Sequence, residues 1–105
     1  MIIIEGHGWG NNYNGILPPW DSNMFLSYHK YWNKNDPASV KNIIASRDKY
    51  NVPVWLGETG ENSNVSFTEA IRLFEEKNIG WSWWPFKKLG LSNPLQIRSN
   101  LNYDQ

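Results

Sequence analysis

The glutamate at position 58 is the residue of this chain whose surroundings best suit chemistry. Glu58 follows the apolar run at 52–56 and stands between Gly57 and Gly60. Glycines let the backbone turn tightly, and functional groups of α/β sheets collect at the carboxyl ends of the strands. A carboxylate placed there can serve as a nucleophile or as an acid and base. We therefore expect a functional Glu58, the alternative being an exposed glutamate in a turn.

His29 and Tyr31 form the second group of chemical interest. The two residues lie two positions apart on one predicted strand, so their side chains point to the same face of the sheet. A tyrosine hydroxyl beside a carboxylate donates a hydrogen bond that orients it and favours its charged form. The alternative is a histidine–aromatic stripe in the core. A metal site made by His7 and His29 is a weaker hypothesis, because neither has a close second ligand at a familiar spacing.

Aromatic residues are unusually frequent in this sequence. The 105 residues include seven Trp, five Tyr and four Phe. A buried Trp needs a partner for its N–H, which makes it a costly choice for plain core filling. Sugar rings have apolar C–H faces that stack on indole, so this composition suggests a carbohydrate ligand. The alternative is an ordinary domain with a Trp-rich core.

Composition also excludes several classes of function. Ten basic and ten acidic residues cancel, so nucleic acid and anionic membranes are not expected partners. Without cysteine, disulfides and thiolate chemistry are excluded. No stretch approaches the roughly 20 apolar residues that span a bilayer. The apolar run at 2–4 is too short for a signal peptide.

The pattern along the chain predicts alternating strands and helices. The run at 2–4 suits a strand buried on both faces, and residues 6–23 read as a long loop. A second strand is expected at 24–31, a third at 52–56 and a fourth from about 79 to 84. Asp36 and Pro37 open a helix that ends near 50–51. A capping box at 66–69, with Ser66 as the cap, opens the other helix, at 66–77.

This order predicts an α/β fold with parallel strands and helical crossovers. In the second helix, Phe67, Ala70, Ile71 and Phe74 are expected to form the buried face. In the fourth strand, Gly80, Ser82 and Trp84 share one face, while Trp81 and Trp83 share the other and should pack under helices. The first strand ends in a further cluster, at 5–9, of residues that could take part in binding or catalysis.

Three segments together resemble glycoside hydrolase family 5, the endoglucanase and mannanase family. Val-Pro-Val-Trp-Leu-Gly-Glu-Thr-Gly, which contains Glu58, resembles the nucleophile motif of its seventh barrel strand. The segment 27–31 resembles the His-x-Tyr motif of the sixth strand, and 80–84 resembles the eighth. Residues 2–6 then correspond to the fifth strand, so the resemblance covers almost the whole chain.

The resemblance implies half of a (β/α)₈ barrel, with about four parallel strands, over residues 1–105. It implies retaining cleavage of β-1,4-glycans, of the endo-β-1,4-glucanase type, without a cofactor or metal, in a secreted or periplasmic protein. Glu58 would be the nucleophile, hydrogen-bonded by Tyr31, with His29 lining the site. Trp84 would stack under the sugar to be cleaved. Trp9 and Lys87 are further candidates for contacts with the glycan.

The sequence departs from the family in one respect. The acid/base glutamate of the family lies in an Asn-Glu motif after the fourth strand, and that motif does not occur here. Retaining hydrolysis needs two carboxyl groups about 5–5.5 Å apart. Glu5 is a weaker candidate for the second group, and Glu61 is weaker still. We therefore expect a chain without the amino-terminal half of the barrel, inactive alone and able to self-associate through its open sheet edges.

Two other classes of function remain open at this point. A non-catalytic carbohydrate-binding module would use the Trp and Asn residues, but such modules are usually β-sandwiches, which the two helical patterns disfavour. A structural half barrel without a sugar site is the other alternative.

Overall fold

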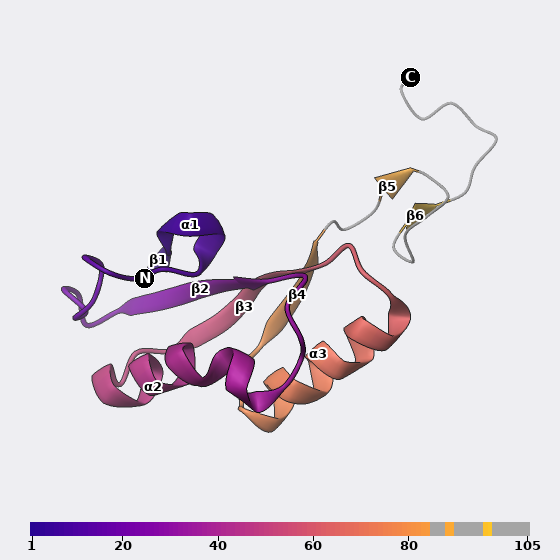
Figure 1. Ribbon diagram of the computed structural model, residues 1–105. Coiled ribbons are helices and arrows are strands. Elements are labelled where there is room, and N and C mark those ends of the chain that lie inside the picture. The colour runs from indigo at the N-terminus through magenta and orange to yellow at the C-terminus, as the bar shows by residue number, and fades with distance from the viewer. Residues whose placement is uncertain (85–87, 90–95, 98–105) are drawn as a thin grey trace, which may run out of the picture.

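Four parallel strands form the central sheet of the structure, a computed structural model that describes residues 1–84, 88–89 and 96–97 (Figure 1). Their order in the sheet is the order in the chain: β1 (Ile2–Glu5), β2 (Met24–Lys30), β3 (Val54–Gly60) and β4 (Trp81–Trp84). The predicted α/β sheet of four parallel strands is thereby confirmed. Two short strands, β5 (Lys88–Leu89) and β6 (Gln96–Ile97), pair with each other in parallel.

The first crossover helix begins where its capping residues predict. The carboxylate of Asp36 accepts a hydrogen bond from the Ser39 amide at 3.0 Å, and a 3₁₀ turn, η1 (Pro37–Val40), leads into α2 (Lys41–Tyr50). Asn51 ends α2 in the left-handed conformation, with φ of 49°. Asn tolerates this conformation better than most residues, so the sequence also indicates where the helix ends.

The second crossover helix begins earlier than predicted. In α3 (Asn64–Glu76) the cap is Ser63, whose hydroxyl accepts from the Ser66 amide at 3.2 Å. The prediction of Ser66 as the cap was therefore wrong. Two serines three residues apart compete for the same role, and Ser63, in an extended conformation, lets the helix gain almost one turn of backbone hydrogen bonds.

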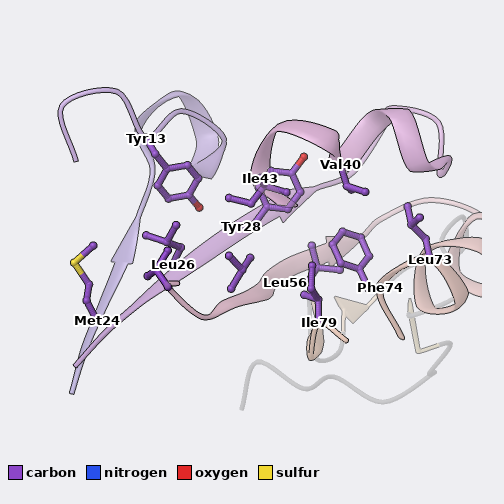
Figure 2. Packing of buried hydrophobic residues seen from close by; sticks show 12 residues of the cluster. Tyr13, Met24, Leu26, Tyr28, Val40, Ile43, Leu56, Leu73, Phe74 and Ile79 are labelled. Atoms are coloured by element: carbon purple, nitrogen blue, oxygen red, sulfur yellow. The ribbon is translucent and has the colours of Figure 1, made fainter. Parts of the chain in front are cut away.

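The hydrophobic core lies between the sheet and these two helices. Leu26, Leu56 and Phe74 are essentially fully buried, and Figure 2 shows side chains of β2 and β3 meeting those of α2 and α3. Phe67 and Ala70 are buried as predicted. Leu73 is also buried although the predicted face omitted it, and Ile71 is only half-buried.

The opposite face of the sheet is open among the described residues. Ile3 is 52% exposed and Trp55 is 37% exposed, so the prediction that the first strand is buried on both faces was wrong. The physical reason is that α2 and α3 cover the same face of the sheet (Figure 1). The predicted packing of the fourth strand under a helix is confirmed, because the Trp83 ring lies 4.6 Å from the ring of Phe67 on α3.

The segment between β1 and β2 is more ordered than the predicted loop. It contains a single helical turn, α1 (His7–Gly10), in which Gly8 and Trp9 have left-handed backbone angles. Tyr13 anchors the segment to β2, because its buried hydroxyl donates to the carbonyl oxygen of Ser27. No helix in the described part of the chain is long and apolar enough to cross a membrane.

Candidate active site

Glu58 lies inside β3, which runs on to Gly60 instead of ending at residue 56 as predicted. The pairing of β2 with β3 is irregular at this point: Tyr28 pairs with Leu56, but His29 pairs with Glu58. The register therefore skips Gly57. This one-residue shift, typical of a β-bulge, places Glu58 directly beside His29 near the carboxyl ends of both strands.

The carboxylate of Glu58 is held through one of its two oxygens. The Tyr31 hydroxyl donates a hydrogen bond of 2.6 Å to Oε2, and Nδ1 of His29 lies 3.5 Å from the same atom. Within the described residues Oε1 accepts no hydrogen bond, and the side chain is 32% exposed. One oxygen is thus oriented by Tyr31 and His29, while the other has no hydrogen bond within the described residues.

Tyr31 is suited to act as a permanent donor. Burial, together with its hydrogen bond to Glu58 and the negative charge there, raises the pKa of the Tyr31 phenol well above its ordinary value of 10.0. The phenol therefore stays protonated at any physiological pH. The Asn62 side chain donates to the Tyr31 carbonyl oxygen at 3.3 Å, which ties this residue to the start of α3.

His29 is enclosed between the sheet and α1. Only 7% of its side chain is exposed, and Gly10 approaches so closely that a Cβ there would lie 2.6 Å from Cγ of the ring. Gly10 also has φ of 78°, so both space and backbone conformation require glycine. Oε1 of Glu5 lies 3.7 Å from Nε2 of His29, and the imidazole therefore stands between two carboxyl groups.

A hollow of about 610 Å³ opens beside Glu58. It is lined by Trp9, Asn11, Tyr28, His29, Lys30, Tyr31, Trp32, Asn33 and Glu58. Four of the predicted residues, Trp9, His29, Tyr31 and Glu58, are therefore brought together. Trp9 is 91% exposed and Trp32 is 74% exposed, so two indoles are accessible at this end of the sheet.

Sequence reasoning missed several residues of this hollow. Trp32 and Asn33 directly follow the His-x-Tyr segment, and their position after a strand end could have identified them. Lys30 is buried and its ammonium donates to the carbonyl oxygen of Asn33 at 2.7 Å; burial lowers its pKa. No pattern of neighbouring residues identifies Asn11 as a site residue, because it reaches the hollow only through the path of the segment between β1 and β2.

Trp84 and Lys87 do not join this group. Trp84 stands at the end of β4, opposite Gly60, and is 51% exposed, but it is not among the residues that line the hollow. Lys87 lies outside the described residues. Among those that are described, no cluster of three or more His, Cys, Asp or Glu side chains is arranged to hold a metal ion.

Comparison with known proteins assigns the family. The family model described as Cellulase (glycosyl hydrolase family 5) matches residues 1–90, which include the four strands of the sheet and the whole of the Glu58 hollow. Searches of curated proteins and of solved structures give no match. Four parallel strands alternating with helices agree with part of the α/β barrel of that family. The chain therefore belongs to the cellulase family, glycosyl hydrolase family 5.

Proposed function

We propose that this chain supplies the nucleophile side of a retaining glycosidase that cleaves β-1,4-glycans in the manner of an endo-β-1,4-glucanase. The observation that carries the proposal is the carboxylate of Glu58, with Oε2 held by Tyr31 at 2.6 Å and Oε1 free within the described residues. Family membership supports glycoside hydrolysis in general. The geometry supports the particular role of Glu58.

The reaction proceeds in two displacements. Oε1 of Glu58 attacks the anomeric carbon, the bond from that carbon to the leaving oxygen breaks, and a second carboxyl group gives its proton to that oxygen. The same group, now a carboxylate, takes a proton from water, which attacks the anomeric carbon and releases Glu58 from the ester. Two inversions at one carbon give net retention.

Glu5 is poorly placed to be the second carboxyl group. It contacts His29 at Nε2, while Glu58 contacts Nδ1, so the imidazole separates the two carboxylates. We propose instead that Glu5 orients His29. The acid/base then comes from outside these residues, with 1–105 forming the carboxyl-terminal half of a (β/α)₈ barrel, because the Asn-Glu motif is absent here.

The substrate proposed is a neutral polysaccharide. The exposed indoles of Trp9 and Trp32 beside Glu58 offer flat apolar surfaces on which sugar rings stack. Trp84, at the end of the strand next to β3, is proposed to stack under the sugar to be cleaved. Since polysaccharides of this class are extracellular, we propose that the protein acts outside the cytoplasm.

The test of the nucleophile uses this chain joined to an upstream segment that completes the barrel. Glu58→Gln is expected to lower kcat on soluble β-1,4-glucan by a factor on the order of 10⁴ or more, because a neutral amide cannot attack. Glu5→Gln is the matched control, since it removes a carboxylate that contacts the same imidazole. It is expected to lower kcat by only about tenfold, the effect of a weakened positioning contact.

Product stereochemistry distinguishes the two carboxyl roles. In a Glu58→Ala variant, azide can enter the vacated space and attack the anomeric carbon, which gives a glycosyl azide of inverted configuration. An azide product of retained configuration would identify residue 58 as the acid/base instead. Unchanged hydrolysis by the Glu58→Gln protein would reject the assignment altogether.

A further inference from the structure

Lys30 is a buried cation that the proposed reaction does not use. The residue is only 2% exposed, and among the described residues no carboxylate lies within ion-pair distance of its ammonium. Moving an ammonium out of water costs free energy unless hydrogen bonds replace its hydration. The hydrogen bonds that Lys30 makes therefore indicate why a cation is kept here.

All of these hydrogen bonds go to the loop that follows β2. The ammonium donates to the carbonyl oxygens of Asn33 at 2.7 Å and of Lys34 at 2.9 Å. It also donates to the side-chain oxygen Oδ1 of Asn33 at 3.2 Å. An ammonium has three N–H donors and no acceptor, so these three contacts use its whole capacity. Lys30 thus ties the loop to the strand and contacts Asn33 twice.

Lys30 can influence the Glu58 hollow only through this loop. Adjacent residues of a strand point to opposite faces of a sheet, so Lys30 and His29 leave β2 on opposite faces. The ammonium of Lys30 is fully occupied by the loop and donates nothing to Glu58. Asn33, however, is among the residues that line the hollow together with Glu58.

The contact with Lys30 determines which end of the Asn33 amide is available to a ligand. A side-chain amide has an acceptor oxygen and a nitrogen with two N–H donors. Because an ammonium can only donate, Oδ1 must be the atom that faces Lys30. The nitrogen Nδ2 makes no hydrogen bond within the described residues, and Asn33 is exposed. The available end of Asn33 is therefore a donor of fixed polarity.

We propose that Lys30 is a positioning residue, which fixes the amide of Asn33 as a hydrogen-bond donor to an oxygen atom of the glycan bound beside Glu58. An asparagine without this contact could turn either end of its amide to a sugar, so the ammonium removes one of two modes of binding. The identity of the ligand rests on the proposed function. The polarity of the amide rests on the contacts of Lys30 alone.

The first test is calorimetric titration of the completed barrel carrying Glu58→Gln with cellotetraose. Asn33→Ala is expected to weaken the affinity about 3- to 10-fold, the effect of one hydrogen bond. Lys30→Met, which removes the ammonium and keeps an unbranched apolar side chain, is expected to weaken it by a similar factor. The double variant should bind no more weakly than Asn33→Ala, because Lys30 acts through Asn33 and the two effects are not additive.

The second test observes the amide itself by NMR. The two Nδ2–H signals of Asn33 are expected to shift in a saturable manner as cellotetraose is added, and to shift less in the Lys30→Met variant. A purely structural role of Lys30 would leave these signals unaffected by the ligand. Unshifted Nδ2–H signals at saturation overturn the proposal.

Lys34→Met is the matched control, because it makes the same replacement in the same loop at a side chain that is 85% exposed. It should leave the affinity unchanged. Asn33 is also exposed, so Asn33→Ala keeps the test decisive if Lys30→Met fails to fold. Undiminished affinity in Asn33→Ala, or additive effects of Lys30→Met and Asn33→Ala, overturns the proposal.

The outcome is separable from that for the nucleophile. Affinity that depends on Lys30 and Asn33, together with unchanged hydrolysis by the Glu58→Gln protein, would reject the nucleophile and keep the donor role of Asn33. Loss of hydrolysis in Glu58→Gln, together with undiminished affinity in Asn33→Ala, would keep the nucleophile and reject the donor role.

Discussion

Tyr31 holds Glu58 through a contact that depends on the protonation of the phenol. The hydroxyl donates to Oε2 at 2.6 Å, and it can do so only while it keeps its proton. Burial and the neighbouring carboxylate raise the pKa of this phenol, which extends the donating form to higher pH. The hydrogen bond from Tyr31 to Glu58 therefore persists across the neutral pH range, and it depends on the single hydroxyl oxygen of Tyr31.

Tyr31→Phe in the completed barrel is expected to lower kcat about 10- to 100-fold. A hydrogen bond to a charged group contributes about 1.5–3 kcal/mol, and each 1.36 kcal/mol of barrier corresponds to a factor of ten. The KM should change little, because the phenyl ring keeps the wall of the hollow. Steady-state kinetics on a soluble β-1,4-glucan check this. A kcat equal to that of the wild type would show that Glu58 is oriented by other groups.

At the scale of elements, the irregular pairing of β2 with β3 and the start of α3 together position the site. The register skips Gly57, and this brings His29 to Glu58. The helix α3 begins at the segment that also carries Asn62, whose side chain holds the Tyr31 carbonyl oxygen. The capping residue of α3 therefore affects both stability and the backbone next to Tyr31.

Ser63→Ala is expected to lower the free energy of unfolding by about 1 kcal/mol, because the Ser66 amide loses its acceptor. Chemical denaturation followed by circular dichroism measures this. Glu69→Gln is the control: Glu69 would complete a capping box with Ser66 as the cap, but the observed cap is Ser63. No change is expected there, and a larger loss from Glu69→Gln than from Ser63→Ala would contradict the observed cap.

At the scale of the whole molecule, the sheet has one covered and one open face. Each of β1 and β4 has a single neighbouring strand in the four-stranded sheet, and such edges present unpaired backbone groups. The open face carries Ile3 and Trp55, both substantially exposed. Apolar surface next to unpaired edges favours association with another polypeptide.

The 105-residue chain alone is therefore expected to self-associate in a concentration-dependent manner. Sedimentation velocity should give a weight-average mass above the monomer value of 12.3 kDa, and this excess should fall when Ile3 and Trp55 are both replaced by Lys. Lys49→Ala, a surface change on α2, should leave the association unchanged. A single monomeric species over a hundredfold range of concentration would refute the expectation.

Much of the fold was predictable because the signals are local. Asp36, Pro37 and Asn51 act on the backbone within one turn of their own positions, and continuous apolar runs mark strands in any context. Glu58 could be identified for the same reason, because the apolar run before it and the glycines beside it predict the carboxyl end of a strand. The His-x-Tyr spacing placed His29 and Tyr31 on one element before any contact was known.

Long-range packing decided the rest. The run that contains Ile3 predicts a strand buried on both faces of the sheet. Burial depends on which face the helices cover, and α2 and α3 cover the same face. The residues after Ser66 match a capping box, but the helix begins after Ser63, which lies almost one turn earlier and is the observed cap. The register shift beside Gly57 joins β2 to β3, and the hollow beside Glu58 is lined by Asn11 together with residues of β2, so both features bring together segments distant in the chain. Such contacts follow from the summed packing of all elements, which no local pattern encodes.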